Sequence, residues 1–153
     1  MFTTKVLVAL ECAECSAPSL RVVASQFQPD SVELYLLHVI DPAAYPAPSE
    51  GAARDPAQID ALRQANLQRA HDLVDRAMRV FLDSGYRVQT AVREGELRLT
   101  IVAYARWVKA DVILLSSHKS RGLGALTFDG VSDYVVSHAP CSVEVIRNWS
   151  HAA

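Results

Sequence analysis

The chain has 153 residues, of which half are hydrophobic and 21% are charged, with a formal net charge of -2. This length and composition predict a single domain with a substantial buried core. The scattered Lys and Arg residues argue against nucleic-acid binding, and the apolar runs are too short to span a bilayer. Three cysteines are too few for a disulfide framework, which favours the cytoplasm.

The first third of the sequence predicts two buried strands separated by a helix. Residues 5–10 (KVLVAL) and 32–40 (VELYLLHVI) are apolar runs typical of strands buried on both faces. Between them a helix is expected to begin at Ser16 and to end before residues 29–31 (PDS). Its expected apolar positions are Leu20, Val23, Ala24 and Phe27.

Residues 41–58 are rich in Pro and Ala and lack apolar periodicity. They are therefore predicted to form a mobile flap over the binding edge of the sheet. Residues 59–82 predict a long amphipathic helix, closed by Ser84 and Gly85. Its expected apolar face includes Leu62, Ala65, Leu73, Ala77 and Phe81.

The second half of the sequence alternates between strands and helices. Strands are predicted over residues 87–93, 111–115 and 142–146, and helices over 96–109 and 131–137. Such alternation implies right-handed βαβ units. The predicted fold class is therefore α/β: an open, twisted parallel sheet with helices on both faces, in three layers.

Ligands of open α/β sheets bind outside the carboxyl ends of the strands. The residues after the first, second and fourth strands, namely Glu11, Cys12, Asp41 and residues 116–121, are thus expected to face one cleft. Cys141 precedes a strand and belongs to the opposite edge.

Several segments of the chain resemble the universal stress protein family. They are KVLVAL, LLHVID, REGEL, KADVILLSSHKSRGL and VSDYVVSHAPCSVEVI. The resemblance covers essentially the whole chain and implies a five-stranded parallel sheet in the order 3-2-1-4-5, of the adenine nucleotide alpha hydrolase-like type. It also implies a homodimer formed through the last strand, Ser142 to Ile146, and in many members a bound ATP or other adenine nucleotide.

The nucleotide-binding members of that family carry Gly-x-x-Gly, nine residues, then Gly-Ser or Gly-Thr. The corresponding residues here are Ser116, Lys119, Asp129 and Gly130, so every glycine of the motif is replaced. Glu11 stands where an Asp is usual. If a nucleotide binds, the resemblance implies contacts from Leu10, Glu11, Cys12, Val39, Ser116, Ser117, His118, Lys119, Arg121, Gly122, Asp129, Gly130, Val131 and Ser132.

These replacements act against phosphate binding in different degrees. Lys119 is bulky but adds a positive charge, whereas a carboxylate at Asp129 about 4 Å from a phosphate is repelled by about 4 kcal/mol. Binding at 1 μM is worth only about 8 kcal/mol. The loop is either an altered anion site, made of Ser116, Ser117, Lys119, Ser120 and Arg121, or a solvated loop of a non-binding member. We favour the second interpretation.

Cys12 and Cys15 form a C-x-x-C between a strand and a helix, where thioredoxin-like proteins place a redox pair. The neighbouring Glu11 and Glu14 oppose thiolate formation, so incidental thiols are the favoured interpretation. A zinc site of Cys12, Cys15 and His118 lacks a fourth ligand, and no metal site is predicted. His38 is expected to be a structural histidine inside a strand, and His71 a solvated one.

Three hypotheses follow from the sequence. The first is a non-catalytic homodimeric stress-response or interaction protein with weak or no ATP binding. The second is an adenine-nucleotide sensor that uses the altered phosphate loop. The third is a thiol redox or metal protein that uses Cys12 and Cys15.

Overall fold

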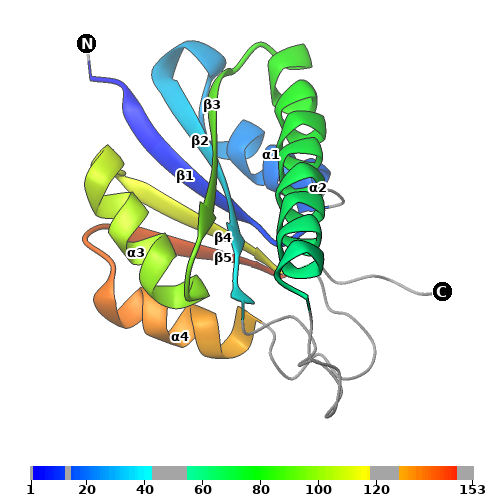
Figure 1. Ribbon diagram of the computed structural model, residues 1–153. Helices are drawn as coiled ribbons and strands as arrows, with labels where there is room; N and C mark the ends of the chain where they lie inside the picture. The colour runs from blue at the N-terminus through cyan, green and yellow to red at the C-terminus, as the bar shows by residue number, and fades with distance from the viewer. Residues whose placement is uncertain (1, 13–14, 43–54, 118–127, 148–153) are drawn as a thin grey trace, which may run out of the picture.

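A parallel β-sheet lies at the centre of the molecule (Figure 1). The computed structural model describes residues 2–12, 15–42, 55–117 and 128–147. Within them the sheet has five strands in the order β3-β2-β1-β4-β5, which confirms the order implied by the resemblance. The strands are β1 (Thr4–Leu10), β2 (Val32–Ile40), β3 (Arg87–Glu94), β4 (Val112–Ser117) and β5 (Ser142–Arg147).

Helices cover both faces of this sheet. A 3-10 turn, η2 (Pro29–Ser31), separates the first helix from β2. One face carries α1 (Ser16–Gln26) and α2 (Pro56–Asp83), and the other carries α3 (Leu97–Val108) and α4 (Phe128–His138). The predicted three-layer α/β architecture is therefore confirmed.

The two helical layers explain why β1 is apolar and buried from Val6 to Leu10. Its alternate residues Leu7 and Ala9 pack in the core beneath α3 and α4. Val6 and Val8 pack in the second core, beneath α1 and α2. Because successive side chains of a strand point to opposite faces, a central strand with two covered faces has no position for an exposed polar residue.

The largest corrections to the predicted boundaries are at α2, α4 and β4. Helix α2 begins at Pro56, where the flap was expected to continue to residue 58. Asp55 caps it, since its carboxylate accepts a hydrogen bond from the amide of Ala57 (3.3 Å), and proline suits the first helical position. The rest of the predicted flap, residues 43–54, lies outside the described residues. Helix α4 begins at Phe128 instead of residue 131, and β4 continues to Ser117.

The predicted apolar face of α2 was wrong in its N-terminal half. Leu62 is 41% exposed and Ala65 is exposed. The buried residues of α2 are Ala70, Val74, Ala77 and Phe81. A helix of 28 residues is about 42 Å long, whereas the nine residues of β2 span about 30 Å, so part of α2 extends beyond the sheet.

The buried face of α1 also differs from the prediction. Ala24 is exposed, while Ser16 and Ser19 are buried. Ser19 is tolerated in the core because its hydroxyl donates to the carbonyl of Cys15 (2.7 Å).

Candidate functional site

The carboxyl ends of the central strands meet at one edge of the sheet, as predicted. Leu10, at the end of β1, pairs with Ser116 of β4. Val39 of β2 lies next to the end of that strand and is buried. Beyond Leu10, Glu11 is exposed and Cys12 is half-buried. This edge is the candidate functional site.

His38 holds two strands together at this edge. Its ring nitrogen Nδ1 donates a hydrogen bond to the carbonyl of Leu10 (2.8 Å), which links β2 to the end of β1. The predicted structural role of His38 is therefore confirmed. His71 is exposed on α2, also as predicted.

Two carboxylates close the N-terminus of α3 at the same edge. Asp41, which follows β2, accepts a hydrogen bond from the amide of Leu97 (3.0 Å). Glu96 caps the helix by accepting from the amide of Leu99 (3.1 Å). Burial raises the pKa of Glu96, but hydrogen bonds from Arg98 and Leu99 outweigh it, and the net shift of this pKa is downward.

The capping role of Asp41 was not found from the sequence. Asp41 and Leu97 are 56 residues apart, so no local pattern joins them. The Asp-Pro pair after a strand was the only signal, and it was assigned to the cleft in general.

The start of α4 forms the other side of the site. Asp129 and Gly130 are the second and third residues of this helix. Gly130 is exposed, and a Cβ placed on it would meet open space. Val131 is buried in the core and Ser132 is half-buried. The predicted loop residues His118, Lys119, Ser120, Arg121 and Gly122 lie outside the described residues.

The sulfur atoms of Cys12 and Cys15 lie 2.7 Å apart at the β1 end of the site. Cys141 directly precedes β5 and so lies at the opposite edge of the sheet, as predicted. Burial, together with the nearby Asp111 carboxylate, raises the pKa of the Cys141 thiol. Among the residues that the structure describes, no group of three His, Cys, Asp or Glu side chains is arranged to hold a metal ion.

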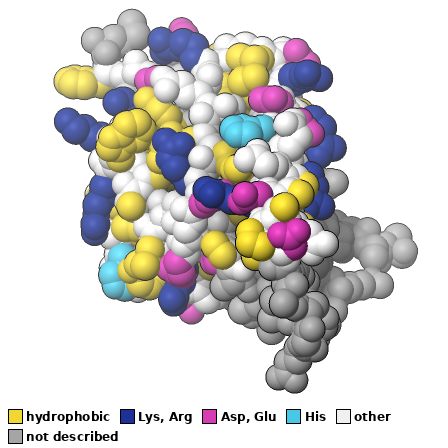
Figure 2. Space-filling model, in the orientation of Figure 1, with side chains coloured by type: hydrophobic (Ala, Val, Ile, Leu, Met, Phe, Trp, Pro, Cys, Tyr) yellow, Lys and Arg dark blue, Asp and Glu magenta, His cyan; other side chains and the backbone are white. Residues whose placement is uncertain are grey.

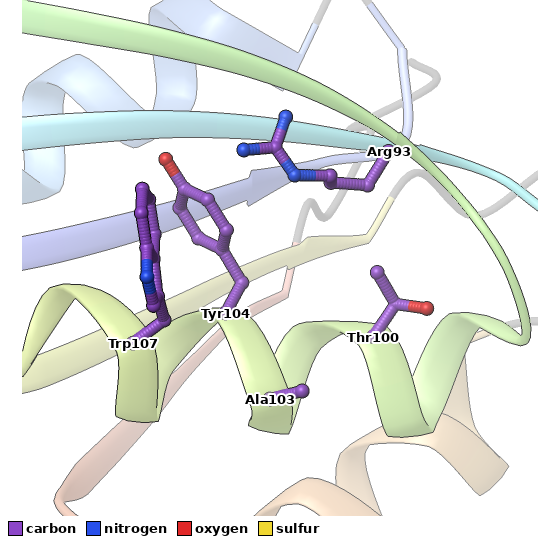
Figure 3. A pocket seen from close by; sticks show the side chains of 5 residues that line it. All are labelled: Arg93, Thr100, Ala103, Tyr104 and Trp107. Carbon is purple, nitrogen blue, oxygen red and sulfur yellow. The ribbon is translucent and has the colours of Figure 1, made fainter.

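A shallow pocket of about 260 Å³ lies between β3 and α3 (Figure 3). Its lining residues are Arg93, Thr100, Ala103, Tyr104 and Trp107. The guanidinium of Arg93 lies over the ring of Tyr104, 5.3 Å from its centroid, and Trp107 is 72% exposed. This lining offers an aromatic surface and one cation, with no carboxylate or thiol for acid-base or nucleophilic chemistry. Sequence analysis missed the pocket because β3 and α3 contribute to it jointly.

Charges of both signs occur over the face shown in Figure 2. Arg63 pairs with Glu94 (3.0 Å) and Arg98 with Glu96 (2.8 Å), and all four side chains are substantially exposed. Within the described part of the chain, no helix has the length and apolar character needed to cross a membrane.

The sequence profile of the universal stress protein family matches residues 3–147. The chain belongs to this family. It is 26% identical to the universal stress protein Sll1388 of Synechocystis, over 94% of this chain and 97% of that protein.

Solved structures of family members share the fold. UspA from Lactobacillus plantarum is 24% identical and superposes with a TM-score of 0.68, over 96% of this chain and 99% of that one. A family protein from Arabidopsis thaliana with AMP bound is 21% identical, with a TM-score of 0.68 over 98% and 95%. A universal stress protein from Archaeoglobus fulgidus in complex with dAMP is 19% identical, with a TM-score of 0.57 over 96% and 100%.

Proposed function

We propose that this protein is a non-catalytic, cytoplasmic homodimer that binds adenine nucleotides weakly or not at all and acts through contacts with other proteins. The observation that carries the proposal is Asp129 in the first turn of α4. A helix N-terminus attracts anions through its unpaired amides and its dipole. At this terminus the sequence has an aspartate, where the nucleotide-binding members have a glycine.

The size of the repulsion between a carboxylate and a phosphate supports weak nucleotide binding. A carboxylate about 4 Å from a phosphate costs about 4 kcal/mol at a surface-like dielectric, before screening by salt. Even a quarter of this cost weakens binding by more than fivefold, since 1.4 kcal/mol corresponds to a factor of ten. Lys119 offsets part of the repulsion, but it also replaces a glycine of the motif.

The two outermost strands of the sheet, β3 and β5, support the homodimer. On the β3 edge, Arg87, Gln89 and Thr90 are exposed. Polar and charged side chains of this kind discourage edge-to-edge pairing. The β5 edge instead exposes Val145 (39%). A two-fold axis beside β5 would bury this apolar surface against its own copy.

The adenine-nucleotide sensor is the second candidate function. It is favoured by the relatives with bound AMP and dAMP described above. It is also consistent with the exposed Glu11, a carboxylate that follows β1 at the candidate site. In this case Lys119 and Arg121 would meet the phosphates.

Nucleotide titration distinguishes the two functions. A ligand with a Kd of about 10 μM, added at about 1 mM, stabilises the folded protein by roughly 2.7 kcal/mol, which shifts Tm by several degrees. We expect no such shift with Mg-ATP, ADP, AMP or cyclic AMP. We expect Asp129→Asn to gain affinity for Mg-ATP by about tenfold, as measured by calorimetry, because the repulsive charge is gone.

Asp133→Asn is the matched control for this substitution. Asp133 is exposed on the same helix, one turn further from its N-terminus. It changes the net charge equally but not the charge at the phosphate position, so it should leave affinity unchanged. A shift of several degrees in the unmodified protein that is lost in Lys119→Glu would reject weak binding and establish the sensor.

A further inference from the structure

The β1–α1 junction brings two thiols into contact. The sulfur atoms of Cys12 and Cys15 lie 2.7 Å apart, and neither cysteine is in a disulfide. A disulfide bond is about 2.0 Å long. Bond formation therefore requires the two sulfur atoms to move by less than about 1 Å.

The backbone around the two cysteines is held on both sides. The amide of Cys15 donates to the carbonyl of Cys12 (3.2 Å), and the carbonyl of Cys15 accepts from the Ser19 hydroxyl (2.7 Å). Cys15 is fully buried among residues such as Val8 of β1, and Cys12 packs against the same core. The free-energy cost of bringing the two sulfur atoms together is therefore met during folding and not during the reaction.

The two thiols differ in their access to solvent. Cys12 is half-buried and can be reached by a small oxidant, whereas Cys15 has no exposed surface. The accessible thiol of Cys12 is therefore suited to attack the oxidant, and the buried thiol of Cys15 is suited to resolve the adduct that forms.

We propose that Cys12 and Cys15 are a reversible dithiol-disulfide pair that exchanges with low-molecular-weight disulfides such as oxidised glutathione. The thiolate of Cys12 attacks one glutathione sulfur, and the other glutathione leaves as a thiolate and takes up a proton. Cys15 then loses its proton and attacks the Cys12 sulfur of the mixed disulfide, releasing the second glutathione. The protein loses two electrons and two protons, and one oxidised glutathione becomes two reduced molecules. This exchange does not depend on nucleotide binding.

Cys141 provides an internal comparison. It lies at the other edge of the sheet and precedes β5, so it cannot reach the pair. Burial and the Asp111 carboxylate disfavour its thiolate. Cys141 can therefore form only a mixed disulfide with glutathione, and its low thiolate fraction slows that reaction.

The test is to equilibrate the native full-length protein with mixtures of reduced and oxidised glutathione near pH 7.5, block the remaining thiols with N-ethylmaleimide, and map the products by mass spectrometry. Glu14 lies between the two cysteines, so a glutamate-specific protease separates them unless they are cross-linked. We expect the Cys12–Cys15 disulfide as the main product, reversible by dithiothreitol. It should form at least about tenfold more readily in the folded protein than in urea, because folding supplies the geometry.

Variants distinguish the roles of the two thiols. Cys15→Ser should accumulate a glutathione adduct on Cys12, and Cys141→Ser should form the disulfide as the unmodified protein does. A lasting glutathione adduct on Cys12 in the unmodified protein would overturn the proposal. Equal disulfide formation in folded and urea-unfolded protein would overturn it as well. Both comparisons use the unmodified chain, so they hold even if a cysteine variant fails to fold.

Discussion

At the residue scale, Glu96 links local sequence to pH-dependent stability. Its carboxylate accepts from the Leu99 amide and pairs with Arg98, and its pKa is lower than the ordinary value of 4.5. We expect Glu96→Ala to reduce the free energy of unfolding by about 1 kcal/mol near pH 7, as loss of a helix cap does. Because the folded pKa is lower than the unfolded one, the contribution is complete at neutral pH and is lost as pH falls through the folded pKa.

Urea denaturation at a series of pH values measures this effect. The difference between the unmodified protein and Glu96→Ala should shrink in acid, and a difference that stays constant well below pH 4 would contradict the capping role. Glu94→Ala is the control. Its carboxylate belongs to an exposed pair with Arg63, which is worth at most about 1 kcal/mol.

Residue roles were predictable where a single side chain decides them. His38 was predicted to be structural because it lies within an apolar strand. In the structure its ring forms a hydrogen bond with the carbonyl of Leu10. Partners distant in sequence were not predictable. The Tyr86 hydroxyl donates to the carbonyl of Phe27, 59 residues away (2.8 Å), and only the assembled fold brings such groups together.

At the element scale, the sequence pattern located the four α-helices and five strands of the described residues but not every boundary. The apolar repeat of α2 begins within the helix, so its first turn was assigned to the flap. The local signal for the true start was the Asp55-Pro56 pair, a cap followed by a residue suited to the first turn. The amphipathic pattern also overstated burial, since Leu62 matches the repeat but is 41% exposed.

Two substitutions in α2 test this division of the helix. Phe81 is fully buried and meets Tyr86 edge to face, with ring centroids 6.5 Å apart. We expect Phe81→Ala to lower the free energy of unfolding by about 3–5 kcal/mol, because it leaves a cavity in the core. Leu62→Ala should cost less than about 1 kcal/mol, since the side chain is already 41% exposed. Chemical denaturation compares the two variants directly, and similar losses would mean that the N-terminal half of α2 is packed after all.

At the scale of the whole molecule, the strand order came from resemblance and not from periodicity. Alternating strands and helices specify a parallel sheet, but many orders satisfy that alternation. The segments that carry the family resemblance reduce these orders to 3-2-1-4-5, which the structure has. The order matters for function because it leaves β3 and β5 as the two edges, with different side chains on each.

The exposed Val145 on β5 leads to the final prediction, which concerns assembly. If a two-fold axis runs beside β5, each substitution there appears twice in one interface. Val145→Lys would then place two positive charges near each other in a surface that should be buried, and we expect it to yield a monomer. Leu82→Lys is the matched control: Leu82 is 47% exposed, but it lies on α2, which packs over β2 and β3. Light scattering after size-exclusion chromatography should give twice 16.7 kDa for the unmodified protein and for Leu82→Lys, but 16.7 kDa for Val145→Lys. A monomeric unmodified protein would reject the dimer, and a dimeric Val145→Lys would place its interface away from β5.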